Sequence, residues 1–182
     1  KGYNQQYNRK EQGVMADYVI IMGYDEHNGS SLEAGSVSSY EFVKEGIEET
    51  IKEVPAEKVI SGIPFFTRLW SETPKTQEEL NQEAGTEAAD YPMKVTSEAL
   101  GMSTARDKIS QAGAETTLDE TTGNNYATWE ADGVTYEIWL EDATSIEPKL
   151  QLMKENKLAG TAAWALGQES SDIWNLILKY VN

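Results

Sequence analysis

The sequence contains no cysteine and only one histidine, His27. The lack of cysteine excludes disulfides, a thiolate nucleophile and Cys-ligated zinc or iron–sulfur sites. A single histidine excludes a metal site built from several imidazoles, and a Ser-His-Asp triad would have to use His27. Because His27 falls in a stretch rich in Gly, Ser and Asn, we expect it to be a solvated turn residue rather than a catalytic one.

Basic residues and long apolar runs are also scarce. The chain has 15 Lys and Arg against 31 Asp and Glu, which gives a formal net charge of −16. Nucleic acids and anionic membrane surfaces attract clustered basic side chains, so this balance argues against both as partners. The longest apolar runs, residues 18–22 and 158–166, are far shorter than the roughly 18 residues that indicate a membrane-spanning helix.

The residues that are present indicate a globular protein. The 182 residues include 5 Trp, 9 Tyr and 3 Phe, which are enough aromatic side chains to build a core. This length predicts one domain, or one domain with a small insertion. The sequence opens on Lys1 with neither an initiator Met nor a signal-like apolar segment, so we expect it to be part of a longer protein.

Strands and helices alternate in the predicted secondary structure. Three apolar segments predict strands: residues 17–25, 58–66 and 158–166. The first is a continuous β-branched run typical of a strand buried on both faces. An apolar stripe from Val43 to Val54 predicts a helix that ends at Pro55. Ser145 is the predicted N-cap of a second helix, and Asp172 opens a third. This order predicts an α/β fold with parallel strands covered by helices.

Residues 67–142 predict a small α+β subdomain inserted after the second strand. It contains one helical stripe near residues 102–112 and then three alternating segments separated by hairpin turns at Gly123 and Gly133. An insertion at this point stands at the carboxyl ends of the parallel strands, which is where α/β proteins bind ligands. We therefore expect a site near the residues that end the three strands: Tyr24, Asp25, Arg68 and Trp164.

The motifs at these strand ends are more specific together than singly. Taken alone, the Tyr-Asp pair could be a core tyrosine with a loop-capping aspartate, and Trp164 could fill a barrel layer. However, Met22-Gly-Tyr-Asp25, Gly62-Ile-Pro-Phe-Phe-Thr-Arg68 and Gly160-Thr-Ala-Ala-Trp164 in this order resemble glycoside hydrolase family 18. Residues 34–43 look most like the bacterial branch that lyses spore cortex and cell wall. Residues 134–142, followed by Ser145, look like the return of the insertion to the barrel.

The resemblance implies a fold. The chain would be the C-terminal portion of a (β/α)8 TIM barrel, namely its last three βα units, with a chitinase insertion domain. The barrel parts would be residues 1–66 and 143–182, and the insertion residues 67–142. Since three strands cannot close a barrel of eight, we expect the fragment to need the missing N-terminal half of the barrel, or else to form a homodimer or a swapped assembly.

The resemblance also implies roles for residues. The mechanism would be retaining and substrate-assisted, with the N-acetyl oxygen of the sugar as nucleophile. Tyr24 would hold the acetamido group and Asp25 would hydrogen-bond the distorted sugar. Four further residues would contact the sugar: Met22, Phe66, Arg68 and Trp164. Phe66 stands where relatives usually have tyrosine. Trp139 and Glu141 would be further substrate-binding candidates, because the matching residues face the cleft in some relatives. The family uses neither a metal nor an organic cofactor, so we expect none.

The family's general acid is missing from this sequence. It lies in an Asp-x-x-Asp-x-Asp-x-Glu motif, and no such spacing occurs here. A general acid typically contributes about 10²–10⁴-fold to the rate, so we expect this chain alone to be nearly inactive. The parent would cleave β-1,4 bonds at N-acetylglucosamine in peptidoglycan or chitin-like glycans, outside the cell or in the spore or cell wall.

A non-catalytic carbohydrate-binding protein of the same fold is the alternative. An upstream Glu at the end of the acidic motif would indicate a hydrolase, and a non-acidic residue there a lectin. The retained pair of Tyr24 and Asp25 favours the enzyme, because a pure binder has less need to orient the acetamido group.

Overall fold

The computed structural model describes residues 8–181. Fourteen helices and strands follow one another in this part of the chain: α1 (Arg9–Met15), β1 (Val19–Met22), α2 (Tyr40–Ile51), β2 (Val59–Pro64), β3 (Phe66–Pro74), α3 (Gln77–Gln82), β4 (Met93–Gly101), α4 (Met102–Ala112), β5 (Thr117–Asp119), β6 (Asn124–Ala131), β7 (Val134–Leu140), α5 (Ala143–Glu155), β8 (Gly160–Trp164) and α6 (Ile173–Val181). Short 3-10 turns lie at Ala56–Lys58 and Glu87–Asp90.

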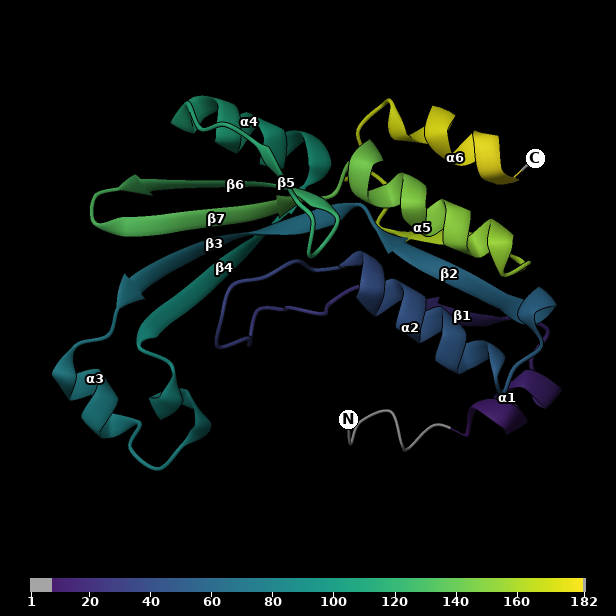
Figure 1. The fold of residues 1–182 in the computed structure, drawn as a ribbon, viewed down its shortest axis with the longest axis horizontal. Helices are drawn as coiled ribbons and strands as arrows, with labels where there is room; N and C mark the ends of the chain where they lie inside the picture. Colours follow the sequence, from purple (N-terminus) through teal and green to yellow (C-terminus); the bar gives the residue numbers. More distant parts are fainter. Residues whose placement is uncertain (1–7, 182) are drawn as a thin grey trace.

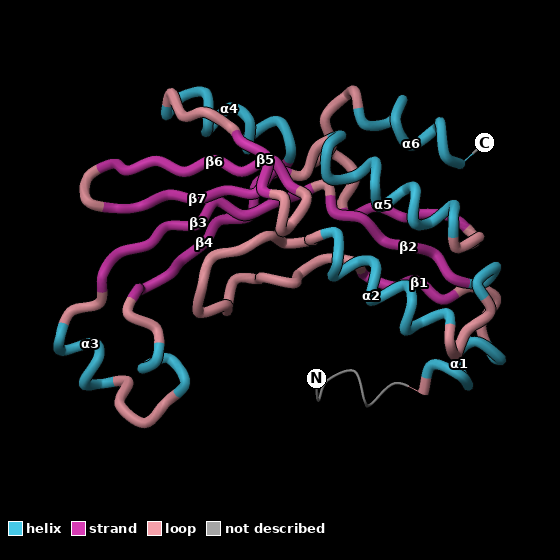
Figure 2. The backbone as a smooth tube through the Cα atoms, viewed as in Figure 1, coloured by secondary structure: helices cyan, strands magenta, loops and turns pink. Residues whose placement is uncertain are grey.

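The strands form two sheets that lie side by side (Figure 1). The first has the order β1-β2-β8 and is entirely parallel, with Ile20 beside Ile60 and Ile60 beside Gly160. The second has the order β4-β3-β7-β6-β5 and is antiparallel. Only Phe65 separates β2 from β3, so one continuous stretch passes from the parallel sheet into the antiparallel one (Figure 2). The predicted mixed α/β fold is confirmed.

Helices α2, α5 and α6 lie along one side of the parallel sheet (Figure 1). Alternate residues of β2 point into this layer, and the largest apolar cluster joins the strand to α5 and α6: Ile63, Phe65, Met102, Ile146, Leu150, Ile173, Leu176 and Ile177. Burying one such side chain contributes about 1.5–3 kcal/mol. This layer supplies the main core of the fold.

The opposite face of the parallel sheet carries exposed apolar side chains. Ile20 is 56% exposed, Met22 70% and Trp164 60%. The prediction that the first strand is buried on both faces is therefore wrong for this structure. The helices among residues 8–181 cover only one face of the sheet, so the side chains that alternate to the other face meet solvent.

The antiparallel sheet has a core of its own under α4. Leu69, Leu100 and Ile138 from three strands pack against Ala105 and Ile109 of the helix. The helical stripe and the last three strands of this region match the sequence prediction. The prediction missed the long antiparallel pair of β3 and β4, whose connection contains α3, at the lower left of Figure 1.

Two helix boundaries differ from those predicted. Helix α2 ends at Ile51, and Val54 is buried just beyond it against Gly13. The N-cap of α5 is Asp142 rather than Ser145. The Asp142 side chain accepts from the backbone N–H groups of Thr144 and Ser145, and the Ser145 hydroxyl is hydrogen-bonded to the Asp142 N–H. Ser145 is thus the reciprocal member of a capping box.

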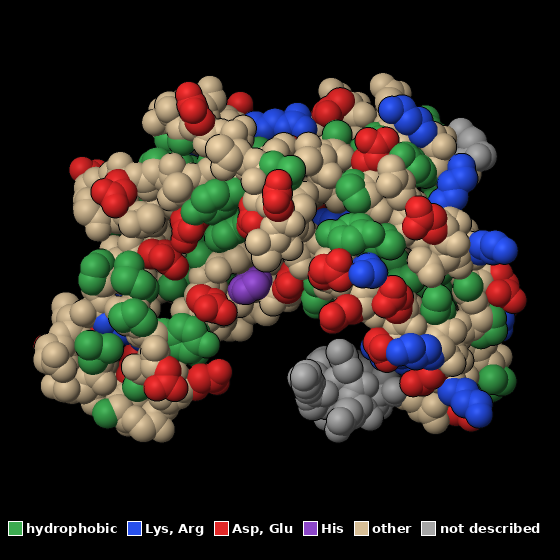
Figure 3. Space-filling model, in the orientation of Figure 1, with side chains coloured by type: hydrophobic (Ala, Val, Ile, Leu, Met, Phe, Trp, Pro, Cys, Tyr) green, Lys and Arg blue, Asp and Glu red, His purple; other side chains and the backbone are tan. Residues whose placement is uncertain are grey.

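Acidic side chains are prominent on the surface, as expected from the excess of Asp and Glu in the sequence. On the face shown in Figure 3, acidic side chains are spread over both halves, and most of the visible Lys and Arg lie over the half that contains α2, α5 and α6. None of the helices among residues 8–181 has the length and apolar character needed to cross a membrane.

Candidate functional site

A shallow apolar pocket of about 360 Å³ lies on the open face of the parallel sheet. Its lining comes from all three parallel strands: Ile20, Met22, Tyr24, Gly62, Ala162, Ala163 and Trp164. The lining combines small residues of β2 and β8 with four larger side chains from β1, the segment just after it and the end of β8. The structure thus brings together three predicted site residues at the carboxyl ends of β1 and β8: Tyr24, predicted to be catalytic, and Met22 and Trp164, predicted to bind substrate.

Tyr24 packs against residues of β2 and of the start of β3. Its ring meets Phe66 edge to face, with 6.0 Å between ring centroids. A Cβ on Gly62 would lie 3.4 Å from the Tyr24 ring and 2.8 Å from the Ile21 carbonyl oxygen, so glycine at position 62 leaves room for both β1 and the ring. Burial, and secondarily the charge of Asp25, raise the pKa of Tyr24 above its usual value of 10.0. A phenol is already protonated at neutral pH at its usual pKa, and this shift favours the protonated, hydrogen-bond-donating form further.

Asp25 and Trp164 lie at points where the strands turn. Asp25 has a left-handed backbone with φ of 64°, a conformation that Asp tolerates better than most residues. This turn allows Asp25 to depart from the strand alternation that would direct it opposite to Tyr24. The Trp164 carbonyl accepts from the Phe65 N–H at 2.7 Å, and the Trp164–Ala165 peptide bond is cis. Trp164 is 60% exposed, so its ring is available to a ligand.

Phe66 and Arg68 share one face of β3, because they are two residues apart on the strand. The Phe66 ring is buried against Tyr24. Arg68 Nη1 donates to the Ser97 hydroxyl at 3.0 Å, and a Cβ on Gly29 would lie 3.2 Å from it. Arg68 Nε is buried with no hydrogen-bond partner among the described residues. Neither residue lines the apolar pocket, although Phe66 contacts its lining residue Tyr24; both lie on β3, which follows β2 out of the parallel sheet.

Trp139 lies on the antiparallel sheet and not in the pocket. Its indole Nε1 donates to Asp119 Oδ2 at 2.9 Å, and its ring packs on Tyr126 with 4.7 Å between centroids. Burial alone raises the pKa of Asp119, but hydrogen bonds from Trp139, Thr122 and the backbone outweigh it and hold that pKa below the usual 3.8.

Glu141 does not reach a cleft in this structure. It is 1% exposed and pairs with Lys149, whose Nζ lies 3.0 Å from Glu141 Oε2. Asn124 and the Ser145 hydroxyl donate to the two carboxylate oxygens. Burial raises the pKa of Glu141, against the lowering effect of Lys149 and these donors. Since β7 ends at Leu140, Glu141 leaves the strand alternation and turns into the interior.

The remaining polar candidates have structural partners. His27 Nδ1 is hydrogen-bonded to the Ser36 carbonyl at 2.9 Å, as fits a turn residue. Among residues 8–181 there is no group of three or more His, Cys, Asp or Glu side chains arranged to hold a metal ion.

Sequence reasoning treated residues 26–39, the connection from β1 to α2, as a loop and missed that part of it is buried. We call this segment the strap. Its Gly, Ser and Asn content looks like that of a solvated loop, yet residues 35–39 are all buried. The alternation of Ser with Val37 was the available signal, because a fully solvated loop has no need of a buried valine.

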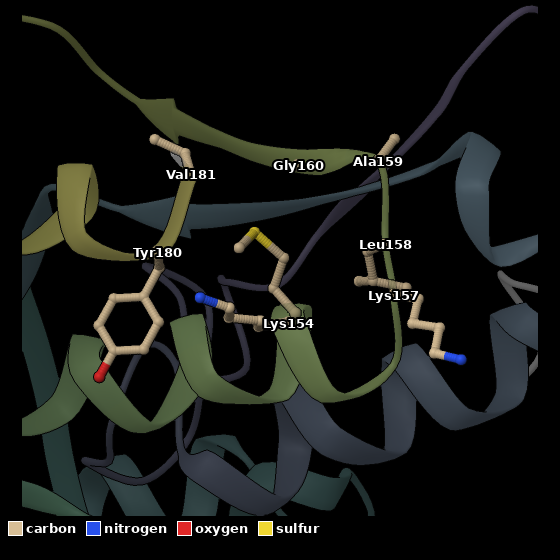
Figure 4. Close-up of a pocket in the computed structure, with 8 residues that line it drawn as sticks. Lys154, Lys157, Leu158, Ala159, Gly160, Tyr180 and Val181 are labelled. Atoms are coloured by element: carbon tan, nitrogen blue, oxygen red, sulfur yellow. The ribbon is translucent and has the colours of Figure 1, made fainter.

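A second pocket, of about 230 Å³, lies at the opposite end of β8 (Figure 4). Its walls come from α5, α6 and the start of β8, and they include Lys154, Leu158, Tyr180 and Val181. The Tyr180 hydroxyl donates to Glu147 at 2.8 Å. This pocket contains none of the predicted site residues.

Comparison with known proteins identifies the protein family of this chain. The model of the family described as Glycosyl hydrolases family 18 matches residues 1–169. The chain belongs to this family.

Two individual relatives within this family are similar to nearly the whole of this chain. The chain is 28% identical to the uncharacterized glycosylase YvbX of Bacillus subtilis (strain 168), covering 95% of this chain and 45% of that protein. It is 25% identical to the cortical fragment-lytic enzyme of Bacillus anthracis, covering 93% and 36% respectively.

Solved structures of the same kind superpose on the chain. A chitinase from Chromobacterium violaceum ATCC 12472 gives a TM-score of 0.78 at 25% identity, covering 96% of this chain and 49% of the chitinase. The spore cortex-lytic enzyme SleL of Bacillus megaterium QM B1551 gives 0.77 at 26% identity, covering 97% and 36%. The chain therefore spans less than half the length of each of these relatives.

Proposed function

We propose that this chain is part of a glycoside hydrolase that cleaves β-1,4 bonds next to N-acetylglucosamine by substrate-assisted, retaining catalysis. The observation that carries the proposal is the apolar pocket at the carboxyl ends of three parallel strands, with Tyr24 and Trp164 on its rim. Membership of family 18 supports the reaction class.

The pocket suits a pyranose ring that carries an N-acetyl group. Trp164 offers an exposed indole face for the apolar face of the sugar. Met22 and the small residues of β8 leave room for the acetyl methyl. Tyr24, whose pKa is raised above the already high usual value by burial and then by Asp25, donates a hydrogen bond to the acetamido group. These contacts hold the acetamido oxygen against the anomeric carbon.

The chemical step then needs no protein nucleophile. The acetamido oxygen forms a bond to the anomeric carbon as the glycosidic bond breaks, and the departing oxygen takes a proton from a general acid. Positive charge develops on the bound sugar, and the carboxylate of Asp25, next in the chain to Tyr24, stabilises it. Water then opens the cyclic intermediate with retention of configuration.

The general acid lies outside this chain in our proposal. The sequence has no Asp-x-x-Asp-x-Asp-x-Glu motif. Among the described residues, no carboxylic acid lines the pocket, and Asp25 lies just beyond its lining residue Tyr24 in the chain. We therefore propose that the chain alone is nearly inactive and that the rest of the protein supplies the acid.

The same missing portion would complete the barrel. Both β1 and β8 have a free edge within residues 8–181, and the face between them is apolar and exposed. The relatives are more than twice as long as the matched region. We propose that the upstream strands of a (β/α)8 barrel pair with these edges, while residues 67–142 stand above the barrel as an insertion domain.

Among glycans, we propose peptidoglycan of the spore cortex or cell wall ahead of chitin. One relative is named a cortical fragment-lytic enzyme and one solved structure is a spore cortex-lytic enzyme. The action would take place at the cell envelope. Chitin stays the alternative substrate, since a structural neighbour is a chitinase.

A carbohydrate-binding protein without activity is the second candidate. One observation favours it: Trp164 is exposed in an apolar pocket. A sugar can stack on this indole even if no general acid is present to cleave it. The orientation of Tyr24 beside the pocket favours the hydrolase, because a stacking site alone gains little from it.

One experiment separates the two functions. The full-length protein is incubated with N-acetylglucosamine oligomers and with purified peptidoglycan, using this chain as control, and the products are identified by mass spectrometry. Cleavage by the full-length protein but not by the chain supports the hydrolase and a general acid upstream. Binding without cleavage supports the lectin. Cleavage by the chain alone contradicts our placement of the acid.

A further inference from the structure

The strap, residues 26–39, is folded back on itself beside the candidate site. The Glu26 N–H donates to the Val37 carbonyl at 3.1 Å, and the His27 N–H donates to the Ser36 carbonyl at 3.3 Å. The returning half of the strap, residues 35–39, is buried between the end of β1 and the antiparallel sheet. Three of these five buried residues are serines, Ser36, Ser38 and Ser39, so hydrogen bonds are an important part of what holds the segment in place.

The antiparallel sheet supplies one set of these hydrogen bonds. The Trp70 indole of β3 donates to the Gly35 carbonyl at 2.9 Å. The Ser36 hydroxyl donates to Asn124 Oδ1 of β6, also at 2.9 Å. The strap is thus fastened to two strands of the sheet that stands over the carboxyl ends of the parallel strands.

The strap is also fastened to the peptide group that precedes Tyr24. The Ser38 N–H donates to the Ser36 hydroxyl at 3.1 Å, and the Ser38 hydroxyl donates to the Gly23 carbonyl at 2.6 Å. That carbonyl belongs to the peptide bond between Gly23 and Tyr24. A Cβ on Gly23 would lie 2.8 Å from the Gly62 carbonyl oxygen, so the backbone here is pressed between β2 and the strap.

At its far end the same chain of hydrogen bonds reaches a buried ion pair. Asn124 Nδ2 donates to Glu141 Oε1 at 3.1 Å and to the Leu140 carbonyl at 2.9 Å. Glu141 is paired with Lys149 of α5. The five side chains of this series are each at most 2% exposed: Lys149, Glu141, Asn124, Ser36 and Ser38. Buried polar networks in which every member is satisfied are rigid.

We propose that this buried series of hydrogen bonds, from Lys149 to Ser38, fixes the backbone at Tyr24 and Asp25, so that Ser36, Ser38 and Asn124 are positioning residues of the hydrolase. None of them lines the pocket; each acts through the next, and Ser38 acts through the Gly23 carbonyl. A displacement of about 1 Å in a catalytic group can cost on the order of 10²-fold in rate. The kinetic tests of this inference rest on the proposed function, because they measure turnover.

The test compares two serine-to-alanine variants of the full-length protein. Ser38→Ala removes the hydroxyl that holds Gly23. Ser61→Ala is the matched control, because the Ser61 hydroxyl is equally buried but has no hydrogen-bond partner among the described residues. We expect Ser38→Ala to lower kcat by about tenfold with KM changed by less than about threefold. We expect Ser61→Ala to leave both unchanged. Equal kcat values for the two variants, measured well below both unfolding midpoints, would overturn the proposal.

A double variant tests whether the series acts as a chain. If Ser36 acts through Ser38, the variant with both Ser36→Ala and Ser38→Ala loses no more kcat than the worse single variant. Effects that multiply would mean that the two hydroxyls act separately, which contradicts the proposed series.

A readout that needs no turnover separates this inference from the proposed function. If the wild-type full-length protein cleaves no glycan, the proposed function fails, and the backbone amide shifts of Tyr24 and Asp25 are measured by NMR instead. Larger shifts in Ser38→Ala than in Ser61→Ala would support the positioning role. Unchanged shifts at both residues would refute it.

Discussion

At the scale of single residues, Trp139 is held by a carboxylate as well as by ring packing. Asp119 accepts from the indole N–H at 2.9 Å and from the Thr122 hydroxyl at 3.0 Å. Because these donors favour the charged form and keep its pKa below 3.8, the carboxylate stabilises the folded chain above that pH. This stabilisation is lost as the pH falls through the lowered pKa.

Asp119→Ala is therefore expected to lower the free energy of unfolding at neutral pH by about 1 kcal/mol. The difference from wild type should shrink under acidic conditions, once Asp119 is protonated in both folded and unfolded chains. Urea unfolding at neutral and acidic pH measures this. The exposed Asp132, in the turn between β6 and β7, provides Asp132→Asn as a control. A pH-independent loss in Asp119→Ala would contradict the assigned role of the charge.

The residues of the pocket could be predicted because strand ends obey a simple rule. Once β1, β2 and β8 are recognised as parallel neighbours, their carboxyl ends meet at one edge, which brings Met22, Tyr24 and Trp164 together. Glu141 could not be placed in the same way. Its position two residues after Trp139 indicates the same face of a strand, but the strand ends at Leu140, and only the structure shows that end.

At the scale of elements, the missed pair of β3 and β4 has a physical explanation. Strand β3 follows β2 after a single residue, so no turn residues separate two strands that belong to different sheets. Strand β4 alternates exposed and half-buried side chains, many of them polar, because only α4 covers part of one face. Its apolar periodicity is too weak to recognise without its partner. By contrast α4, with a clear buried stripe, was predicted closely.

Helix α5 joins the two sheets, and its first turn depends on Asp142. The Asp142 carboxylate accepts from two backbone N–H groups and from Asn125. We expect Asp142→Ala to lower the free energy of unfolding by about 1 kcal/mol, which is the usual contribution of an N-cap side chain. Denaturant unfolding followed by circular dichroism measures it. Asp107→Ala, an exposed change inside α4, should cost far less, and equal losses would show that the cap is not the cause.

At the scale of the whole molecule, one face of the parallel sheet is covered by helices and the other is exposed, a difference that the sequence alone did not predict. An apolar run such as residues 18–22 predicts burial on both sides, yet Ile20, Met22 and Trp164 are more than half exposed. Exposed apolar patches that adjoin free strand edges mark interaction surfaces. This open face is where our proposed upstream strands would pack.

We therefore expect the 182-residue chain by itself to self-associate, and a separately produced upstream half to convert it into a single defined complex. Sedimentation velocity at several concentrations measures both. Ile20→Ser should reduce the self-association because it makes the open face more polar. Leu118→Ser is the matched control, since Leu118 is equally exposed, at 54%, but lies on β5 of the other sheet. A monodisperse monomer across the concentration range would mean that the exposed face needs no partner, and the proposed completion of the barrel would then lose its main structural support.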